Sequence, residues 1–381
     1  MSHGIPMVDL SAQYQAIRQE LDAALAAVIA KNAFIGLPSN EFVAGFERDF
    51  AAYAGNRYCV ACGNGTDALE ILLKAAGIGP GAEVLVPALT WIATAEAVTT
   101  VGATPIFVDV LPDRYTIDPA AAAARVTSRT QAIIPVHLYG LPANMPEVMR
   151  IAERHALFVL EDCAQAHGAR LDGRPVGTFG QAASYSFYPS KNLGAWGDAG
   201  AMLTDDEAIA AQARMIAQHG QAGRKHDHRI EGRNSRMDGL QASVLSVKLK
   251  HLPAWTQARQ ARAARYRSAL GALVRGFQAC PSAVDHVYHL FTVELNARDE
   301  VQRVLAEQGI ATAVQYPTPL PLLEAYVRFR HRAEDFPVAS ALTARILSLP
   351  LYPELTSSQQ DDVVAALSKA VARTKPDLTN V

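Results

Sequence analysis

Short apolar runs and helical patterns alternate through the first half of the chain. The apolar runs are of strand length and lie at residues 57–61, 83–87, 104–108, 132–136, 156–160 and 182–187. Segments between them, such as 66–76 and 91–101, instead have apolar residues at helical spacing. Such alternation is typical of an α/β domain, and parallel strands read as near-continuous apolar runs because both of their faces are buried. The pattern therefore predicts an α/β fold with a mostly parallel central sheet flanked by helices.

The two ends of the chain have other patterns. Residues 10–31 are rich in Ala and Leu at helical spacing, and a second helical pattern with recurring aromatic residues follows. Beyond residue 215 the chain becomes glycine-rich and charged, and helical patterns resume at Leu240. A strand-like run at 287–293 and a helical pattern at 357–371 come later. We predict an N-terminal arm with a large domain over residues 1–258, and a smaller α+β domain over residues 259–381.

Composition and charge exclude several classes of protein. Half of the 381 residues are hydrophobic and 19% are charged, which is ordinary for a globular enzyme. The formal net charge of −2 argues against a nucleic-acid-binding protein, whose binding face would be strongly basic. No apolar stretch approaches the roughly 20 residues that span a bilayer, and the first residues lack the features of a signal peptide. We expect a cytoplasmic protein that binds neither nucleic acid nor membrane.

Four cysteines are compatible with a reducing compartment. Cys59 and Cys62 form a C-x-x-C pattern, which occurs in redox and zinc sites. Cys59 lies within an apolar strand-like run, and no second pair supplies the remaining ligands of a structural zinc site. The sequence therefore favours two buried structural cysteines and predicts no metal.

Three features carry candidate chemistry. The run at 156–160 leads to Asp162, and the run at 182–187 leads to Lys191. A glycine-containing turn, residues 63–68, lies between a strand and a helix, where backbone N–H groups suit a phosphate. A pyridoxal-phosphate (PLP) enzyme needs a lysine for the Schiff base, an acid that keeps the pyridine nitrogen protonated, and a phosphate cradle. Together, the three features predict such a site.

Each feature also has a plainer interpretation. Lys191 would be an exposed loop lysine, Asp162 a surface acid, and the turn a structural one without a ligand. Gly63-x-Gly65-x-x-Ala68 also satisfies the dinucleotide fingerprint, which further requires an acid at the end of the second strand. Glu83 has roughly the right spacing but begins its strand, so the dinucleotide interpretation lacks its second element.

The order of the motifs and the residues within them resemble those of the DegT-like sugar aminotransferases. These are fold-type I PLP enzymes that aminate nucleotide-linked keto-sugars. The resemblance extends from Val8 to Pro353, and its most specific stretches are residues 65–69, 161–168, 186–191 and 232–238. It implies a homodimer with composite active sites.

The resemblance also implies roles for single residues. Lys191 would form the Schiff base and shuttle the proton, with Asp162 facing the pyridine nitrogen. His167 would be either catalytic or a core histidine. The cofactor-binding residues would be Gly65, Thr66, Trp91, Asp162, Gln165, Ser186, Lys191 and Asn234.

Substrate recognition is expected from two other segments. Asn234 and Arg236 match a family segment that reaches the neighbouring subunit's site, and the wording at 234–238 is similar to that of members that aminate C3 of the sugar. A small Ser235 would leave space that a tyrosine fills in members that aminate C4. Gln315 stands where many relatives have histidine, whereas Tyr316 is retained. We expect Arg236, Gln315 and Tyr316 to contact the substrate, with the Arg236 fork suited to a sugar carboxylate.

These features predict a PLP-dependent aminotransferase that moves an amino group from L-glutamate to a nucleotide-diphosphate-linked keto-sugar, at C3 in preference to C4. One alternative is a PLP-dependent sugar dehydratase on the same scaffold, in which relatives commonly replace the Schiff-base lysine with histidine. Another is an NAD(P)-dependent oxidoreductase. Lys191 argues against the first, and the joint presence of Asp162, Ser186 and Lys191 argues against the second.

Overall fold

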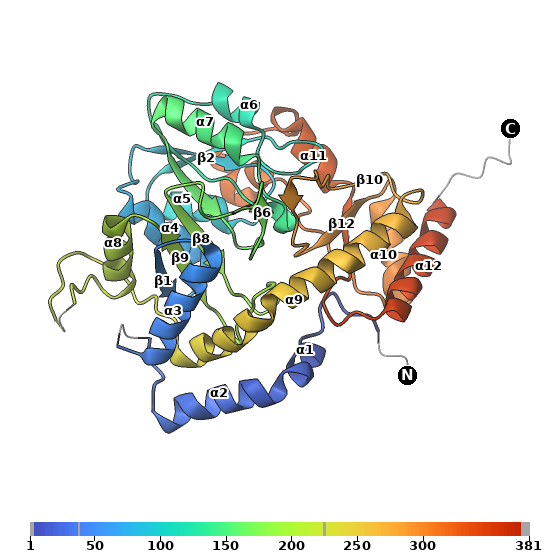
Figure 1. The fold of residues 1–381 in the computed structure, drawn as a ribbon. Helices are drawn as coiled ribbons and strands as arrows, with labels where there is room; N and C mark the ends of the chain where they lie inside the picture. Colours follow the sequence, from blue (N-terminus) through green and yellow to red (C-terminus); the bar gives the residue numbers. More distant parts are fainter. Residues whose placement is uncertain (1–3, 37–38, 224–225, 375–381) are drawn as a thin grey trace, which may run out of the picture.

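A seven-stranded sheet forms the centre of the protein. The computed structural model describes residues 4–36, 39–223 and 226–374 (Figure 1). The strand order is β1-β9-β8-β5-β4-β2-β3. β9 is antiparallel to both of its neighbours, and the other pairs are parallel, so all strands except β9 run in one direction. The strands are β1 Tyr58–Cys62, β2 Glu83–Pro87, β3 Thr104–Val108, β4 Thr130–Ile133, β5 Phe158–Asp162, β8 Ala182–Ser186 and β9 Gly200–Thr204.

Helices cover both faces of this sheet. On one face, α4 (Gly65–Ala75), α5 (Ala93–Thr100) and α8 (Glu207–Ala217) pack against alternate strand residues such as Val60, Val84 and Met202. The intervening residues point to the other face, where they meet α3 (Glu41–Ala54), α6 (Pro119–Ala124), α7 (Met145–His155) and the first half of α9 (Gly239–Leu270). Burial on both faces explains the near-continuous apolar runs in the sequence.

A smaller antiparallel sheet belongs to the C-terminal part of the chain. It has the order β10-β12-β13, formed by Gly276–Phe277, Phe291–Glu294 and Ile346–Leu349. α10 (Arg298–Glu307) and α12 (Ser357–Thr374) pack beside it and complete a separate apolar core. Shorter elements are α1 Leu10–Ala16, α2 Arg18–Ala30, α11 Pro337–Thr343, the strands β6 Arg170–Leu171, β7 Arg174–Pro175 and β11 Val284–Asp285, and the 3-10 turns η1 Leu138–Gly140, η2 Leu320–Leu322, η3 Glu324–Phe329 and η4 Ala333–Asp335.

The long helix α9 joins the two parts, and Figure 1 shows it crossing from below the main sheet to α10 and α12. Leu245 and Leu252 of its first half belong to the core of the main sheet, whereas Tyr266 and Leu270 belong to the core of the smaller one. A division at residue 259 thus falls inside a helix and not in a linker. The N-terminal segment also differs from the expected division, since Ile5 packs into the smaller core and pairs with Ile310.

The apolar pattern located most strands to within two residues. β2 and β3 have the expected bounds, while β1, β5 and β8 are shifted or shortened at their ends by one or two residues. β4 ends at Ile133, short of the expected residue 136. β9 was not expected at all. The predicted α/β fold with a mostly parallel sheet flanked by helices is confirmed.

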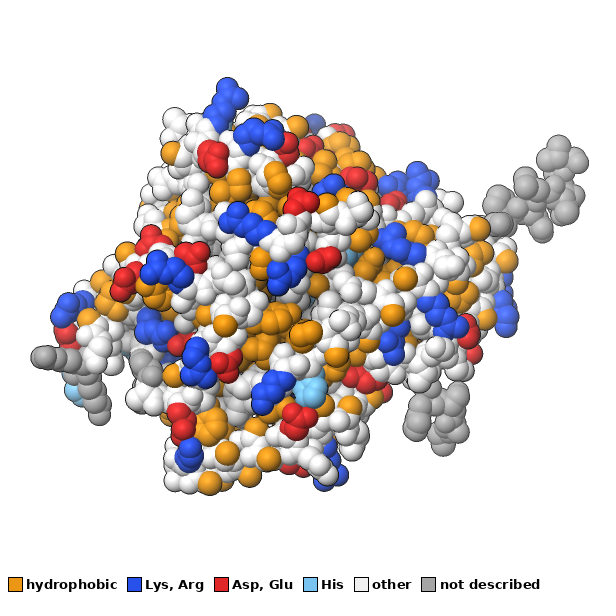
Figure 2. All heavy atoms as spheres, viewed as in Figure 1, with side chains coloured by type: hydrophobic (Ala, Val, Ile, Leu, Met, Phe, Trp, Pro, Cys, Tyr) orange, Lys and Arg blue, Asp and Glu red, His pale blue; other side chains and the backbone are white. Residues whose placement is uncertain are grey.

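Charges of both signs are intermingled on the face drawn in Figure 2, which agrees with the small net charge of the chain. Within the described residues, no helix has the combination of length and apolar composition that a membrane span requires.

Candidate active site

A cavity of about 930 Å³ lies at the edge where the parallel strands end. β1, β2, β5 and β8 run in the same direction, so the residues that follow them meet at this edge, where α/β folds bind their ligands. The segment 313–317 from the C-terminal part closes the other side. The cavity brings together Gly65, Thr66, Trp91, Asp162, Gln165, Ser186, Lys191, Gln315 and Tyr316, all of which were expected at the site.

The phosphate end of the cavity is the N-terminus of α4. Asn64 caps this helix, because its side chain accepts the Asp67 N–H at 2.8 Å. Among the described residues, the N–H groups of Gly65 and Thr66 have no acceptor, and both residues line the cavity. A side chain at Gly65 would lie 2.6 Å from the Ser186 Cβ, so only glycine permits this close approach. Free N–H groups at a helix N-terminus beside a serine hydroxyl suit a phosphate.

Asp162 ends β5 with its carboxylate held in the wall of the cavity. Oδ2 accepts the Thr94 hydroxyl at 3.0 Å, and Oδ1 accepts the Ala164 N–H at 3.1 Å. Burial raises the pKa of this carboxyl, and the two hydrogen bonds and the positive charge of Lys191 oppose the rise. A cationic ring nitrogen beside it would favour the ionised form further.

Thr94 and Thr90 support Asp162 and were missed by the sequence interpretation. Their hydroxyls lie 3.2 Å apart, and Thr90 also lines the cavity. Thr94 lies in α5, where a single threonine on a helical pattern carries no local sign of a partner that is 68 positions away.

Lys191 lines the same cavity and lies in the loop that follows β8. Its backbone N–H donates to the Tyr188 carbonyl at 2.8 Å, which closes a turn. Burial lowers the pKa of the Lys191 ammonium to about 8, against the opposing effect of Asp162. The lysine is therefore partly neutral near pH 8 and suited to act as nucleophile and base.

The loop of Lys191 is held by a histidine that the sequence interpretation also missed. The Asn192 amide donates to the Val287 carbonyl at 3.0 Å, and its oxygen lies 3.3 Å from His289 Nδ1. His289 lines the cavity, and burial followed by the charge of Lys191 lowers its pKa well below the ordinary value. It is a neutral imidazole whose Nδ1 carries the proton, because the Asn192 oxygen can only accept.

Gln165 is fixed from both sides. Its oxygen accepts the Tyr139 N–H at 2.7 Å, and its nitrogen donates to the Tyr316 hydroxyl at 3.1 Å. The Tyr316 ring in turn lies against Trp91, with centroids 5.6 Å apart and planes tilted by 39°. Trp91 is 57% exposed, so its indole face is free to stack on a flat ligand.

Gln315 lines the cavity and carries one buried polar atom that lacks a partner among the described residues. Its carbonyl accepts the hydroxyl of Tyr139, but its side-chain oxygen is buried and has no hydrogen-bond partner among the described residues. A buried acceptor without a partner is costly unless a ligand supplies the donor.

His167 is placed differently from the other expected residues. It is fully buried between the rings of Tyr185 and Phe187, at 5.5 and 5.6 Å, and does not line the cavity. Both ring nitrogens lack partners among the described residues, and burial lowers its pKa to about 3. This placement favours the core alternative over a catalytic one.

Asn234 and Arg236 also lie outside the cavity of their own chain. They alternate with Ser235 and Met237, which are 2% and 1% exposed. Asn234 is exposed and Arg236 is partly so, and alternation along an extended segment places both on the outer side. Ser235 faces inward, where its hydroxyl accepts the Gly63 N–H at 3.0 Å. The small side chain of Ser235 therefore does not open space in this cavity.

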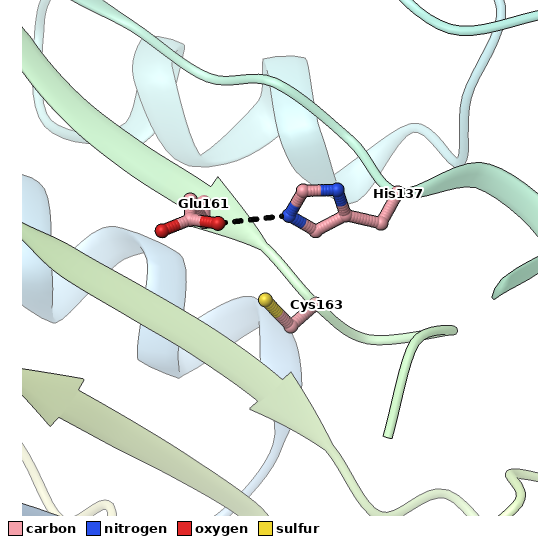
Figure 3. Close-up of side chains that lie close together, drawn as sticks. All are labelled: His137, Glu161 and Cys163. Carbon is pink, nitrogen blue, oxygen red and sulfur yellow. Dashed lines mark hydrogen bonds and ion pairs between the residues drawn. The ribbon is translucent and has the colours of Figure 1, made fainter. Parts of the chain in front are cut away.

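His137, Glu161 and Cys163 lie close enough together for a metal site, as Figure 3 shows. The His137 Nδ1 already accepts the Ala143 N–H at 3.0 Å, so its Nε2 carries the proton that it donates to Glu161 at 3.0 Å. The Glu161 carboxylate also accepts the N–H groups of Gly177, Phe179 and Gly180. The hydrogen bonds occupy both ring nitrogens and both carboxylate oxygens, so the group has a structural explanation without an ion.

Cys59 and Cys62 point to opposite faces of the main sheet. Cys59 packs with α3 and α9, whereas Cys62 packs with α4 and α8, and both thiols are free. Neighbours three apart on a strand cannot bring their sulfurs together, so the C-x-x-C pattern is structural.

Comparison with known proteins assigns the family and the fold. Residues 15–368 match the model of the DegT/DnrJ/EryC1/StrS aminotransferase family. The chain belongs to this family. It is a PLP-dependent aminotransferase, and its own residues fit that cofactor. A lysine whose pKa is lowered by burial, a buried acid, and helix N-terminal N–H groups with no acceptor among the described residues line one cavity.

Two relatives and one solved structure show how close the similarity is. A UDP-N-acetyl-3-dehydro-alpha-D-glucosamine 3-aminotransferase from Acidithiobacillus ferrooxidans is 44% identical over 97% of this chain and 98% of its own. A dTDP-3-amino-3,4,6-trideoxy-alpha-D-glucose transaminase from Streptomyces venezuelae is 42% identical over 97% of both chains. The crystal structure of S. venezuelae DesV has a TM-score of 0.94 and 41% identity, covering 98% of this chain and all of that one.

Proposed function

We propose that the protein transfers an amino group from L-glutamate to C3 of a nucleotide-diphosphate-linked keto-hexose. The observation that carries the proposal is the meeting of Lys191, Asp162 and the free N–H groups of Gly65 and Thr66 in one cavity. The names of the two relatives, which both refer to position 3 of a nucleotide-linked sugar, support the substrate class and the position of amination.

The residues of the site divide the work. PLP supplies a carbonyl that accepts the amino group and a ring that takes up negative charge from the adjacent carbon. Lys191 would carry a proton between the α-carbon of the amino acid and C4′ of the cofactor, and its lowered pKa makes it a suitable base near neutral pH. Asp162 keeps the ring nitrogen protonated, with Thr94 holding the carboxylate in place.

Binding and orientation fall to the remaining residues. Gly65, Thr66 and Ser186 would hold the phosphate, and Trp91 would cover one face of the ring. Gln165, which Tyr139 and Tyr316 fix in position, would lie near the ring oxygen. His167 is not needed for any of these steps, because it is neutral and outside the cavity.

We place part of the active site on a second copy of the chain. Asn234 and Arg236 face outward from a segment whose inner residues are anchored within their own chain, so they are presented to a neighbouring molecule. Asn234 would complete the partner's phosphate site. Arg236 would approach the partner's substrate, where its planar fork pairs with two oxygens of a carboxylate or phosphate.

Sugar recognition is assigned to the segment that closes the cavity. The unpartnered amide oxygen of Gln315 would accept a hydrogen bond from a sugar hydroxyl or amide. The Tyr316 hydroxyl accepts from Gln165 and still has a proton to donate, which burial helps it keep by raising its pKa. Ser235 faces the turn at Gly63, so the names of the relatives, and not the size of this side chain, support amination at C3.

Product analysis tests the proposal directly. The PLP-loaded protein, L-glutamate and matched 3-keto and 4-keto nucleotide sugars would be incubated, and the position of the new nitrogen read by NMR. We expect amination at C3 with release of 2-oxoglutarate. Amination of the 4-keto compound alone would refute the regiochemistry, and water loss without nitrogen transfer would indicate a dehydratase. A yellow absorbance band in the purified protein would separate either from a nicotinamide-dependent oxidoreductase.

A further inference from the structure

Two carboxylates stand beside the proposed phosphate site. Asp67 lies in the first turn of α4 and lines the cavity next to Gly65 and Thr66. Glu70 follows one turn later, and its side chain is almost fully buried. Without a compensating positive charge, these carboxylates would repel a phosphate dianion bound at the Gly65 and Thr66 N–H groups. Solvent and salt screen such a repulsion only weakly, because the charges are partly buried.

Arg233 forms ion pairs with both carboxylates. Its Nη1 donates to Asp67 Oδ1 at 2.7 Å, and its Nη2 donates to Glu70 Oε1. The arginine side chain is 30% exposed, so the ion pairs are partly shielded from solvent, and one of their members, Asp67, lines the cavity. Lys74 adds a second, more exposed contact to Glu70 at 3.4 Å.

The same segment fixes the turn that precedes α4. Ser235 accepts the Gly63 N–H at 3.0 Å, and its own N–H donates to the Ala217 carbonyl at 2.9 Å. The Arg233 N–H donates to the Ile216 carbonyl at 2.7 Å. The segment is thereby tied to the end of α8 on one side and to the phosphate turn on the other.

We infer that Arg233 and Ser235 are positioning residues for the cofactor phosphate. Arg233 offsets part of the negative charge of Asp67 and Glu70 so that the anion is tolerated at the helix terminus, and Ser235 holds Gly63 so that the Gly65 and Thr66 N–H groups are positioned for the phosphate. The inference rests on the proposed phosphate site. Asn234 lies between Arg233 and Ser235, so these two residues also determine the position of the side chain that we place in the partner's site.

A comparison of two cofactor forms isolates the phosphate. The apoprotein would be titrated with PLP and with pyridoxal, which lacks the phosphate, and binding followed by absorbance. Arg233→Gln should weaken PLP binding by roughly tenfold or more and change pyridoxal binding little, because only PLP brings the repelled charge. Arg229→Gln is the matched control, since Arg229 pairs with Asp227 in the same loop on the exposed surface.

Charge removal distinguishes neutralisation from a merely structural role. The double variant Arg233→Gln with Asp67→Asn should regain most of the PLP affinity that Arg233→Gln loses, although the second substitution does not restore the ion pair. Equal losses for PLP and pyridoxal, or no recovery in the double variant, would overturn the role of Arg233. If the wild-type protein bound PLP no better than pyridoxal, the phosphate site and this inference would both be wrong.

Ser235 requires its own measurement. Ser235→Ala should speed hydrogen exchange of the segment containing the Gly63 amide and weaken PLP binding several-fold, by about the 1 kcal/mol of one hydrogen bond. Ser243→Ala is the control, because that serine is equally buried but bonds within α9. Unchanged exchange and unchanged PLP affinity in Ser235→Ala would remove Ser235 from the inference.

Discussion

Glu161 and Asp162 are neighbours in β5, but their carboxylates face opposite sides of the sheet and have different partners. Glu161 accepts hydrogen bonds from His137 and from three backbone N–H groups (Figure 3). Within the part of the chain that the structure describes, Asp162 accepts only from Thr94 and the Ala164 N–H, and it faces the cavity. The Glu161 carboxylate thus stabilises the fold, whereas the Asp162 carboxylate is available to a cofactor.

Glu161→Gln should destabilise the protein, whereas Asp162→Asn should not. A glutamine at 161 would turn an N–H₂ group toward buried donors, which costs about 1–3 kcal/mol of unfolding free energy. Asp162→Asn should instead retain PLP poorly and lose turnover by roughly 10²-fold or more, because a neutral amide cannot stabilise the ring cation. Urea unfolding and steady-state kinetics of both variants measure the contrast. Equal destabilisation by both would contradict it.

In the apoprotein, Asp162 should lower the free energy of unfolding at neutral pH. Burial raises the folded-state pKa of this carboxyl above the ordinary value of about 3.9. Its contribution to stability is therefore complete below the unfolded-state pKa and is lost as pH rises through the folded-state pKa. Asp162→Asn apoprotein should match wild type near pH 3.5 and exceed it near pH 7. Urea unfolding of both apoproteins across this range tests the sign, and a variant that is less stable at pH 7 would refute it.

Lys191→Ala should abolish transamination and leave the fold intact. The loss removes both the nucleophile and the proton carrier, and proton transfer alone is worth about 10²–10⁴-fold. Lys250→Ala, an exposed lysine of α9, is the control. Half-reactions with glutamate, followed by absorbance, measure the loss, and borohydride reduction followed by peptide mapping identifies the modified lysine. A reducible adduct that persists in Lys191→Ala would assign the reaction to another lysine.

The sequence located the parts of the site that follow buried strands. Asp162 and Lys191 could be predicted because each comes after an apolar run, and the ends of parallel strands converge. Gly65 and Thr66 were marked by a glycine turn between a strand and a helix. In these cases the signal is local, because it lies in the same few residues as the function.

The remaining contacts have no local signal. Thr94 meets Asp162 across 68 positions, Asn192 meets His289 across 97, and Gly63 meets Ser235 across 172. Hydrophobic periodicity indicates on which face of its own helix or strand a residue lies. It gives no information about which other element packs against that face.

His167 should make the protein sensitive to acid without taking part in catalysis. Burial lowers its folded-state pKa to about 3, so the unfolded chain takes up a proton first, and stability is lost as pH falls from about 6.5 toward 3. His167→Leu should reduce this loss by up to about 1.4 kcal/mol per pH unit while turnover changes less than tenfold. Urea unfolding between pH 4 and 7 measures the slope. An unchanged slope with a turnover loss of about 10²-fold would place His167 in the mechanism instead.

Mixed dimers should show that each active site needs two chains. Lys191→Ala and Asn234→Ala are each expected to be inactive, but a hybrid dimer has one site that contains both lesions and one that contains neither. Random exchange of equal amounts should therefore restore about a quarter of wild-type activity. Lys191→Ala mixed with Asp162→Asn is the control, because both residues line the cavity of one chain and every site then keeps a lesion. No recovery in the test mixture, after mass spectrometry has verified exchange, would place Asn234 in its own chain's site and refute the composite arrangement.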